Sequence, residues 1–240
     1  MTLRNVAIIQ ARMGSSRFAG KMLARLGGIP LLEWVVRRLV RATTLAQVVL
    51  ATSVSESDNA LAELADSLGI AVFRGSEADV LGRFVGAARM AGADNVVRIC
   101  ADNPFIDPAE VDRLVRYFAD NPCDYACNHQ DRLGSGYADG FGAEILSLSL
   151  LTRLAGIVVE PRYREHVTLY LWDHQTGYRI KAVFPPTGLK HPKMRFDIDR
   201  PEDLATLAKL IEDGVTIDTS AARIIQIAYG STAKSPSSSS

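Results

Sequence analysis

The sequence is poor in cysteine, and the few cysteines present form no recognisable site. Its 240 residues include three, at positions 100, 123 and 127, with no C-x-x-C pair and no histidine at zinc-like spacing. This set makes neither a disulfide framework nor a metal site. We therefore expect reduced thiols and a cytoplasmic protein.

Net charge and long apolar runs are also missing. The 27 basic and 27 acidic residues cancel, which argues against a general nucleic-acid or membrane-surface binder. No apolar run approaches the ~20 residues of a membrane-spanning helix, and the run at 6–9 is too short for a signal peptide. We expect neither nucleic acid nor membrane as a partner.

Positive charge is nevertheless concentrated near the amino terminus. Residues 1–41 contain eight basic residues against the single acid Glu33. A local excess of this kind favours a polyanionic ligand.

Short apolar runs alternate with amphipathic stretches through the first half. The runs at 6–9, 47–52, 70–74 and 95–100 have the length and β-branched content of buried strands. The stretches at 31–42, 57–69 and 79–92 repeat apolar residues at helical spacing. This order predicts an α/β fold with a Rossmann-like, mainly parallel sheet flanked by helices, and ligands at the carboxyl edge of the strands.

The second half is less regular. We predict helices at 108–119 and 164–174, strands at 124–128 and 178–185, and a strand followed by a helix over 194–214. Residues 1–230 are expected to form a single domain, with 125–190 as a candidate subdomain. The Ser-rich stretch 231–240 is expected to be disordered.

The loop after the first predicted strand reads QARMGSSRFAGKML. It is not a P-loop, because five residues separate Gly14 from Gly20 and Met22 follows Lys21. It also lacks the G-x-G-x-x-G pattern of dinucleotide-binding loops. What remains is a loop with two glycines, two serines and three cations, Arg12, Arg17 and Lys21, which suits a triphosphate.

Several motifs together resemble a known family. They are IIQARMGSSRFAGKML, LGGIPLLEWVVRRL, FRGSEADVLGRF, RICADNPFIDP, DGFGAEILS, REHVT and RFDIDRPEDL, which extend to about residue 213. They resemble the cytidylyltransferases of spore-coat polysaccharide and acylneuraminate type, which are similar to the enzymes that activate 3-deoxy-octulosonate. The resemblance implies a nucleotide-diphospho-sugar transferase fold, a homodimer, and Mg²⁺-dependent transfer of CMP from CTP to a sugar acid, with release of pyrophosphate.

Three aspartates are the candidate metal ligands. Asp102 follows a buried strand, where a carboxylate can hold Mg²⁺ against phosphate oxygens. Asp197 and Asp199 stand two apart on a predicted strand, so both would point to one face, and such like charges repel unless a cation lies between them. The alternative for Asp199 is a cap on the helix that begins at Pro201.

The resemblance also assigns nucleotide-binding residues. They are Ala11, Arg12, Gly14, Ser15, Arg17 and Lys21 for the triphosphate, and Arg74, Ser76 and Asp79 for the ribose or base. Helix capping explains Ser76 and Asp79 almost equally well.

The resemblance makes 125–190 a candidate subdomain for sugar binding or dimerisation, and it assigns two residues to the sugar. Arg164 is predicted to clamp the sugar carboxylate, with a solvated arginine as the alternative, and Glu144 resembles a sugar-contacting position. The sequence identifies no side chain as the general base.

The predicted catalytic residues are Arg12, Lys21, Asp102 and Asp199. One alternative is a glycosyltransferase of the same fold, but its D-x-D motif would stand after a central strand, where this sequence reads ADN. The other is a non-catalytic nucleotide-binding domain.

Overall fold

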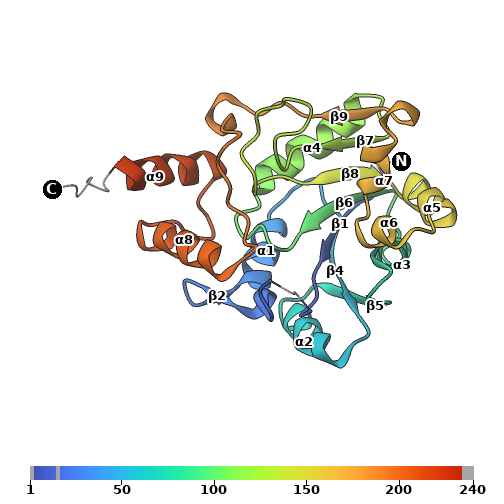
Figure 1. Cartoon of the computed structure of the whole chain (residues 1–240), viewed down its shortest axis with the longest axis horizontal. Coiled ribbons are helices and arrows are strands. Elements are labelled where there is room, and N and C mark those ends of the chain that lie inside the picture. Colours follow the sequence, from blue (N-terminus) through green and yellow to red (C-terminus); the bar gives the residue numbers. More distant parts are fainter. Residues whose placement is uncertain (1–2, 15–16, 234–240) are drawn as a thin grey trace.

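One seven-stranded sheet runs through the centre of the computed structural model, which describes residues 3–14 and 17–233 (Figure 1). Its strand order is β5-β4-β1-β6-β8-β7-β9. The strands are β1 (Asn5–Gln10), β4 (Gln47–Ser53), β5 (Ala71–Gly75), β6 (Asn95–Cys100), β7 (Tyr125–Cys127), β8 (Glu144–Ser147) and β9 (Ile180–Ala182).

The four strands predicted in the first half are confirmed as β1, β4, β5 and β6, and they pair in parallel. Strand β8, which we did not predict, pairs antiparallel with both β6 and β7, while β9 is parallel to β7. The sheet is therefore mixed but mostly parallel, and the predicted α/β class is confirmed. Strands β7 to β9 fall within the candidate 125–190 subdomain and extend this same sheet.

Helices cover both faces of the sheet because apolar side chains alternate along β1. Ala7 and Ile9 pack with α1 (Leu31–Leu39), α2 (Asn59–Ser67) and α4 (Pro108–Asp120). Val6 and Ile8 pack on the other face with α3 (Val80–Met90) and α5 (Leu148–Ile157). Since adjacent strand residues point to opposite faces, each face gains its own apolar core.

A third apolar cluster lies beside the sheet and supports the segment that carries two of the candidate aspartates. It includes residues of α8 (Pro201–Glu212) and α9 (Ala221–Ala233), which lie at the opposite end of the molecule from α5 (Figure 1). Phe196 and Ile198 are buried in this cluster, whereas Asp197 and Asp199 between and after them are only half-buried. The alternation therefore turns both aspartates away from the cluster.

The strand predicted at 194–199 is wrong. This segment belongs to no strand of the sheet and forms one isolated bridge, between Arg195 and Asp139. The side chains at 196–199 still alternate between buried and half-buried positions, because Phe196 and Ile198 pack into the third apolar cluster. The predicted pairing does not form, because the segment crosses the carboxyl edge of the sheet instead of extending it.

Two other predictions need correction. The helix predicted at 164–174 is broken into α6 (Pro161–Glu165) and α7 (Leu169–Asp173). Helix α9 extends to Ala233, so 231–233 is helical rather than disordered, and the rest of the predicted tail lies outside the described residues.

Within residues 3–14 and 17–233, no helix has both the length and the apolar character that crossing a membrane requires.

Candidate active site at the carboxyl edge of the sheet

The loop after β1 forms one wall of a cavity of about 340 Å³, which we call the first cavity. The predicted residues Ala11, Arg12, Gly14, Arg17 and Lys21 all line it. Gly20, which precedes Lys21, has a φ of 71°, a left-handed conformation that glycine adopts without steric cost. Ser15 lies outside the described residues, so its predicted role is left as a prediction.

Arg12 reaches across the first cavity to two carboxylates. Its Nη2 donates to Oε1 of Glu165 at 3.1 Å, and its Nη1 lies 3.8 Å from Oε1 of Glu77. Both partners are about half exposed, so these ion pairs are weak and a phosphate can replace them. Arg12 is therefore positioned over the cavity without being fixed by a buried partner.

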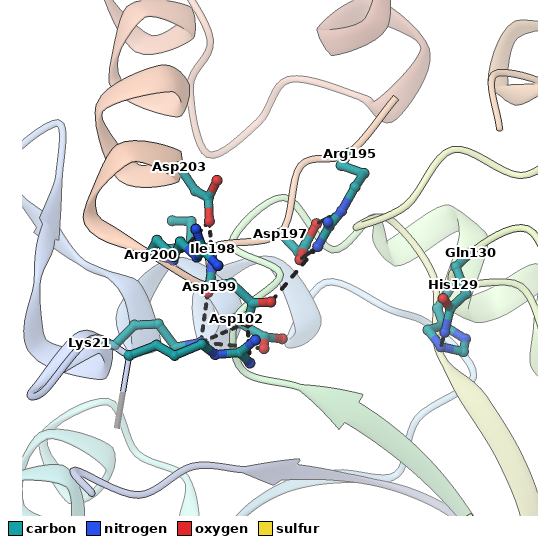
Figure 2. A network of polar contacts seen from close by, with 11 residues as sticks. Lys21, Asp102, His129, Gln130, Arg195, Asp197, Ile198, Asp199, Arg200 and Asp203 are labelled. Carbon is teal, nitrogen blue, oxygen red and sulfur yellow. Dashed lines mark hydrogen bonds and ion pairs between the residues drawn. The ribbon is translucent and has the colours of Figure 1, made fainter. Parts of the chain in front are cut away.

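Lys21 lies between two of the three candidate aspartates (Figure 2). Its Nζ donates to the backbone carbonyl of Ile198 at 2.6 Å, and lies 3.4 Å from Oδ2 of Asp102 and 3.9 Å from Oδ1 of Asp199. The backbone N–H of Ile198 in turn donates to the carbonyl of Asp102. We call Lys21, Asp102 and Asp199 the Lys21 cluster, in which three distant segments of the chain meet.

The Lys21 cluster brings two carboxylates close together. One oxygen of Asp102 and one of Asp199 lie within 4 Å of the same Nζ of Lys21. Burial raises the pKa of Asp102, Lys21 opposes that shift, and Asp197 and Asp199 add to it. A divalent cation would relieve this burial and repulsion, so Asp102 and Asp199 fit a Mg²⁺ site completed by water and phosphate oxygens.

Asp197 is less available than the other two aspartates. Its Oδ1 accepts from Nε of Arg195 at 2.9 Å, and its Oδ2 accepts from Nη2 of the same guanidinium (Figure 2). In the described part of the chain, no group of three or more Cys, His, Asp or Glu side chains could hold a metal by itself. A site built on two carboxylates and a bound triphosphate agrees with this arrangement, since Mg²⁺ seldom takes an all-protein cage.

A second cavity of about 400 Å³ adjoins the first. The two share Arg98, Cys100, Asp102 and His166 in their walls. The second cavity extends away from the Lys21 cluster to residues of β8, α7 and the loop after β7. Those residues include Glu144, His129, Arg132, Asp139 and Trp172.

Glu144 is buried in the floor of the second cavity. Its Oε1 lies 3.0 Å from Nη1 of Arg98, which faces it across the β6–β8 pair, and 3.4 Å from Nε2 of His129. Glu144 therefore lines a cavity that adjoins the Lys21 cluster, and its contact with a sugar stays a prediction.

A family model, that of cytidylyltransferases, matches residues 6–224 of this chain. The chain belongs to the cytidylyltransferase family. It is 36% identical over 227 residues to the spore coat polysaccharide biosynthesis protein SpsF of Bacillus subtilis, covering 92% of each chain.

Solved structures extend this comparison. A cytidylyltransferase from Leptospira borgpetersenii superposes with a TM-score of 0.89 at 30% identity, over 96% of each chain. CMP:2-keto-3-deoxy-manno-octonic acid synthetase, solved in complex with CTP, has a TM-score of 0.67 at 18% identity, over 88% of this chain and all of that one. The second likeness shows the shared fold, which confirms the predicted nucleotidyltransferase architecture.

Four predicted site residues of this cytidylyltransferase lie elsewhere. Of the residues that the structure describes, Arg74, Ser76, Asp79 and Arg164 line neither cavity. Arg74 donates to the carbonyls of Ser53 and Ser55, and Asp79 caps α3 by accepting from the backbone N–H of Gly82. Ser76 accepts a hydrogen bond from the N–H of Asp79. Capping, the alternative, therefore describes Asp79 better, while Ser76 accepts within the turn that precedes α3.

The prediction for Arg164 is corrected in the same way. Its guanidinium pairs with Asp79 and donates to the carbonyls of Ala155 and Val158. All three partners belong to α5, its carboxyl-terminal end or the start of α3. Arg164 therefore stabilises the packing of these helices and is not placed to clamp a sugar carboxylate.

Asp139 is a site residue that sequence reasoning missed. It lines the second cavity, and burial together with Asp197 raises its pKa to about 7, an effect that Arg195 partly opposes. In the sequence, only its place in the Gly-rich stretch before Glu144 points to Asp139. That stretch gave no reason to prefer Asp139 until the fold brought Asp197 and Asp102 near it.

The raised pKa of Asp139 predicts a pH-dependent stability. Between its ordinary value of 3.8 and about 7, the folded state holds a proton that the unfolded state has lost, so stability falls as pH rises through this window. Asp139→Asn is therefore expected to stabilise the nucleotide-free protein by roughly 1–3 kcal/mol at about pH 8, and by little at about pH 4.

Thermal melts in a chelator at both pH values would measure this difference. The exposed Asp66 of α2 provides the matched control, and Asp66→Asn should not change the pH dependence. Equal effects of Asp139→Asn at the two pH values would show that Asp139 titrates normally.

Proposed function

We propose that this cytidylyltransferase transfers CMP from CTP to a hydroxyl group of a sugar acid, with Mg²⁺ as cofactor and pyrophosphate as the second product. The observation that carries the proposal is the Lys21 cluster, where a lysine and two aspartates from three segments meet beside an arginine-bearing loop. Such a site supplies both the cations and the carboxylates that nucleotidyl transfer requires.

The amino-terminal loop is proposed to bind the triphosphate. Arg12 and Lys21 line the first cavity, and Arg17 donates to Asp199 at its edge, 3.1 Å away. Charge-assisted hydrogen bonds from these groups would stabilise the charge that develops on the departing pyrophosphate. A Cβ on Gly14 would lie 3.2 Å from Oε1 of Glu77, so glycine leaves room for this carboxylate beside Arg12.

The carboxylates are proposed to hold the metal. Asp102 and Asp199 would be its protein ligands, and bound Mg²⁺ supplies charge neutralisation of the phosphates and a lower pKa for the attacking hydroxyl. Lys21 meanwhile orients both carboxylates from the protein side, because its Nζ lies within 4 Å of each.

The acceptor is proposed to enter through the second cavity, because Asp102 lies in the wall that the two cavities share. Cys100 lies in the same wall, and burial raises the pKa of its thiol to about 12. A thiol that stays protonated is a poor nucleophile. Cys100 is therefore not assigned as a nucleophile, and the sugar hydroxyl is proposed to attack the α-phosphorus itself, in line with the leaving pyrophosphate.

The test is pyrophosphate release from each of the four common ribonucleoside triphosphates, crossed with a panel of sugar acids and Mg²⁺. CTP with one sugar acid is expected to give sustained release, and the other nucleotides little. Release from all four at similar rates would remove the cytidylyl assignment. Release that needs no acceptor would replace transfer with hydrolysis.

A further inference from the structure

The second cavity contains four buried polar atoms that have no hydrogen-bond partner among the described residues. They are Nε of Arg98, Nε of Arg132, Nδ1 of His129 and Oε2 of Glu144. Leaving such buried atoms unpaired destabilises the folded protein. Their gathering in one cavity indicates that a polar ligand completes the hydrogen bonds.

Arg98 and Glu144 are already committed to one another. Their ion pair, at 3.0 Å, is almost fully buried in the floor of the cavity, and burial also lowers the pKa of the neighbouring His129 to about 4, so that this ring stays neutral. A ligand carboxylate placed here would meet the carboxylate of Glu144 and be repelled. A sugar hydroxyl, which both donates and accepts, suits this part of the cavity better.

Arg132 differs from the other arginines near the site. Within the described chain, no carboxylate forms an ion pair with its guanidinium, which stacks on the ring of Trp172 with Cζ 4.8 Å from the centroid. Trp172 is itself held by Tyr125, through an edge-to-face contact with centroids 5.5 Å apart and a hydrogen bond from its Nε1. The stack therefore fixes a planar, unpaired cation in the cavity wall.

We propose that Arg132 is the specificity-determining residue that binds the carboxylate of the sugar, while the Arg98–Glu144 pair binds a hydroxyl. This inference rests on the proposed function and names the part of the site that recognises the acid. It gives Arg132 the role that the sequence suggested for Arg164, whose guanidinium is occupied by Asp79 and two carbonyls.

The test compares a charged ligand with its neutral counterpart. The probes are 3-deoxy-octulosonate and N-acetylneuraminate, each beside the same sugar with its carboxylate converted to the carboxamide. Titration calorimetry without CTP keeps the result independent of turnover. The wild-type protein is expected to bind one of the two acids more tightly than its amide.

Arg132→Gln is expected to weaken binding of that acid by about 10–100-fold and to leave the amide nearly unchanged, because only the acid loses a charge-assisted contact. Arg132→Lys, which keeps the charge without the planar fork, should recover part of the loss. The control is Arg153→Gln, which removes an exposed arginine stacked on Tyr178 outside both cavities and should change neither affinity.

Equal loss of acid and amide, no preference in the wild-type protein, or binding of neither acid would overturn the proposal. Pyrophosphate release from CTP is measured separately on the same proteins. A preference that depends on Arg132, in a protein that releases no pyrophosphate from CTP with any sugar, would contradict the proposed reaction and leave the carboxylate site standing.

Discussion

Replacing Lys21 with methionine is expected to lower turnover by about 10²-fold or more. The ammonium group, with a side chain only 12% exposed, neutralises Asp102 and Asp199 and holds the backbone of Ile198. Methionine keeps the length of the side chain but leaves two carboxylates facing each other without that charge. Steady-state rates with saturating CTP would measure the effect.

A matched control separates this effect from a general loss of positive charge. Arg25 lies four residues further along, is exposed, and donates only to the nearby carbonyl of Gly28 among its described partners. Arg25→Met should keep near-normal turnover. Lys21→Met with normal turnover and an unchanged melting temperature would remove Lys21 from the catalytic assignment.

The largest losses are expected from Asp102→Asn and Asp199→Asn. Each keeps the shape of the side chain and removes one charge from the shared metal site, so each should abolish Mg²⁺-dependent activity, with a loss of about 10³-fold or more. Because both carboxylates serve one ion, the double variant should be little worse than either single variant. Turnover over a range of Mg²⁺ concentrations would test both statements.

The exposed Asp120 at the end of α4 supplies the control, since Asp120→Asn changes charge far from both cavities. Multiplicative losses in the double variant would show that Asp102 and Asp199 act independently. That result would contradict the shared-metal model even if each single loss were large.

The first half of the fold was predictable because its signals are local. Strands β1, β4, β5 and β6 are short runs of β-branched residues, and the helices between them repeat apolar residues at helical spacing. Because parallel strands end at the same edge of a sheet, the order of the elements alone locates the edge where ligands bind. The sequence alone accordingly places Arg12, Lys21 and Asp102 at one edge of the sheet.

The errors arise where long-range packing overrides a local pattern. The 194–199 segment alternates as a strand does, yet its alternation comes from burial of Phe196 and Ile198 in the third apolar cluster. Asp197 thereby lies beside Arg195, which donates to its carboxylate. The ion pair of Arg164 with Asp79 joins positions 85 residues apart, which no periodicity reveals.

The sugar side was the least predictable for the same reason. Burial and the nearby Asp197 raise the pKa of Asp139, and both come from the fold, where a bridge pairs Asp139 with Arg195. Arg132 stands in an irregular loop, and its proposed role depends on its stack on Trp172, forty residues away. Neither relation leaves a motif in the sequence.

The most direct test of the account follows the fate of each phosphorus atom of CTP. CTP labelled at the α-phosphorus and CTP labelled at the γ-phosphorus would be incubated in parallel with Mg²⁺ and the preferred sugar acid. The account predicts that the α label appears in a nucleotide sugar that resists phosphatase, and the γ label in pyrophosphate. Release of the α label as free CMP, or of the γ label as inorganic phosphate before pyrophosphatase is added, would contradict cytidylyl transfer.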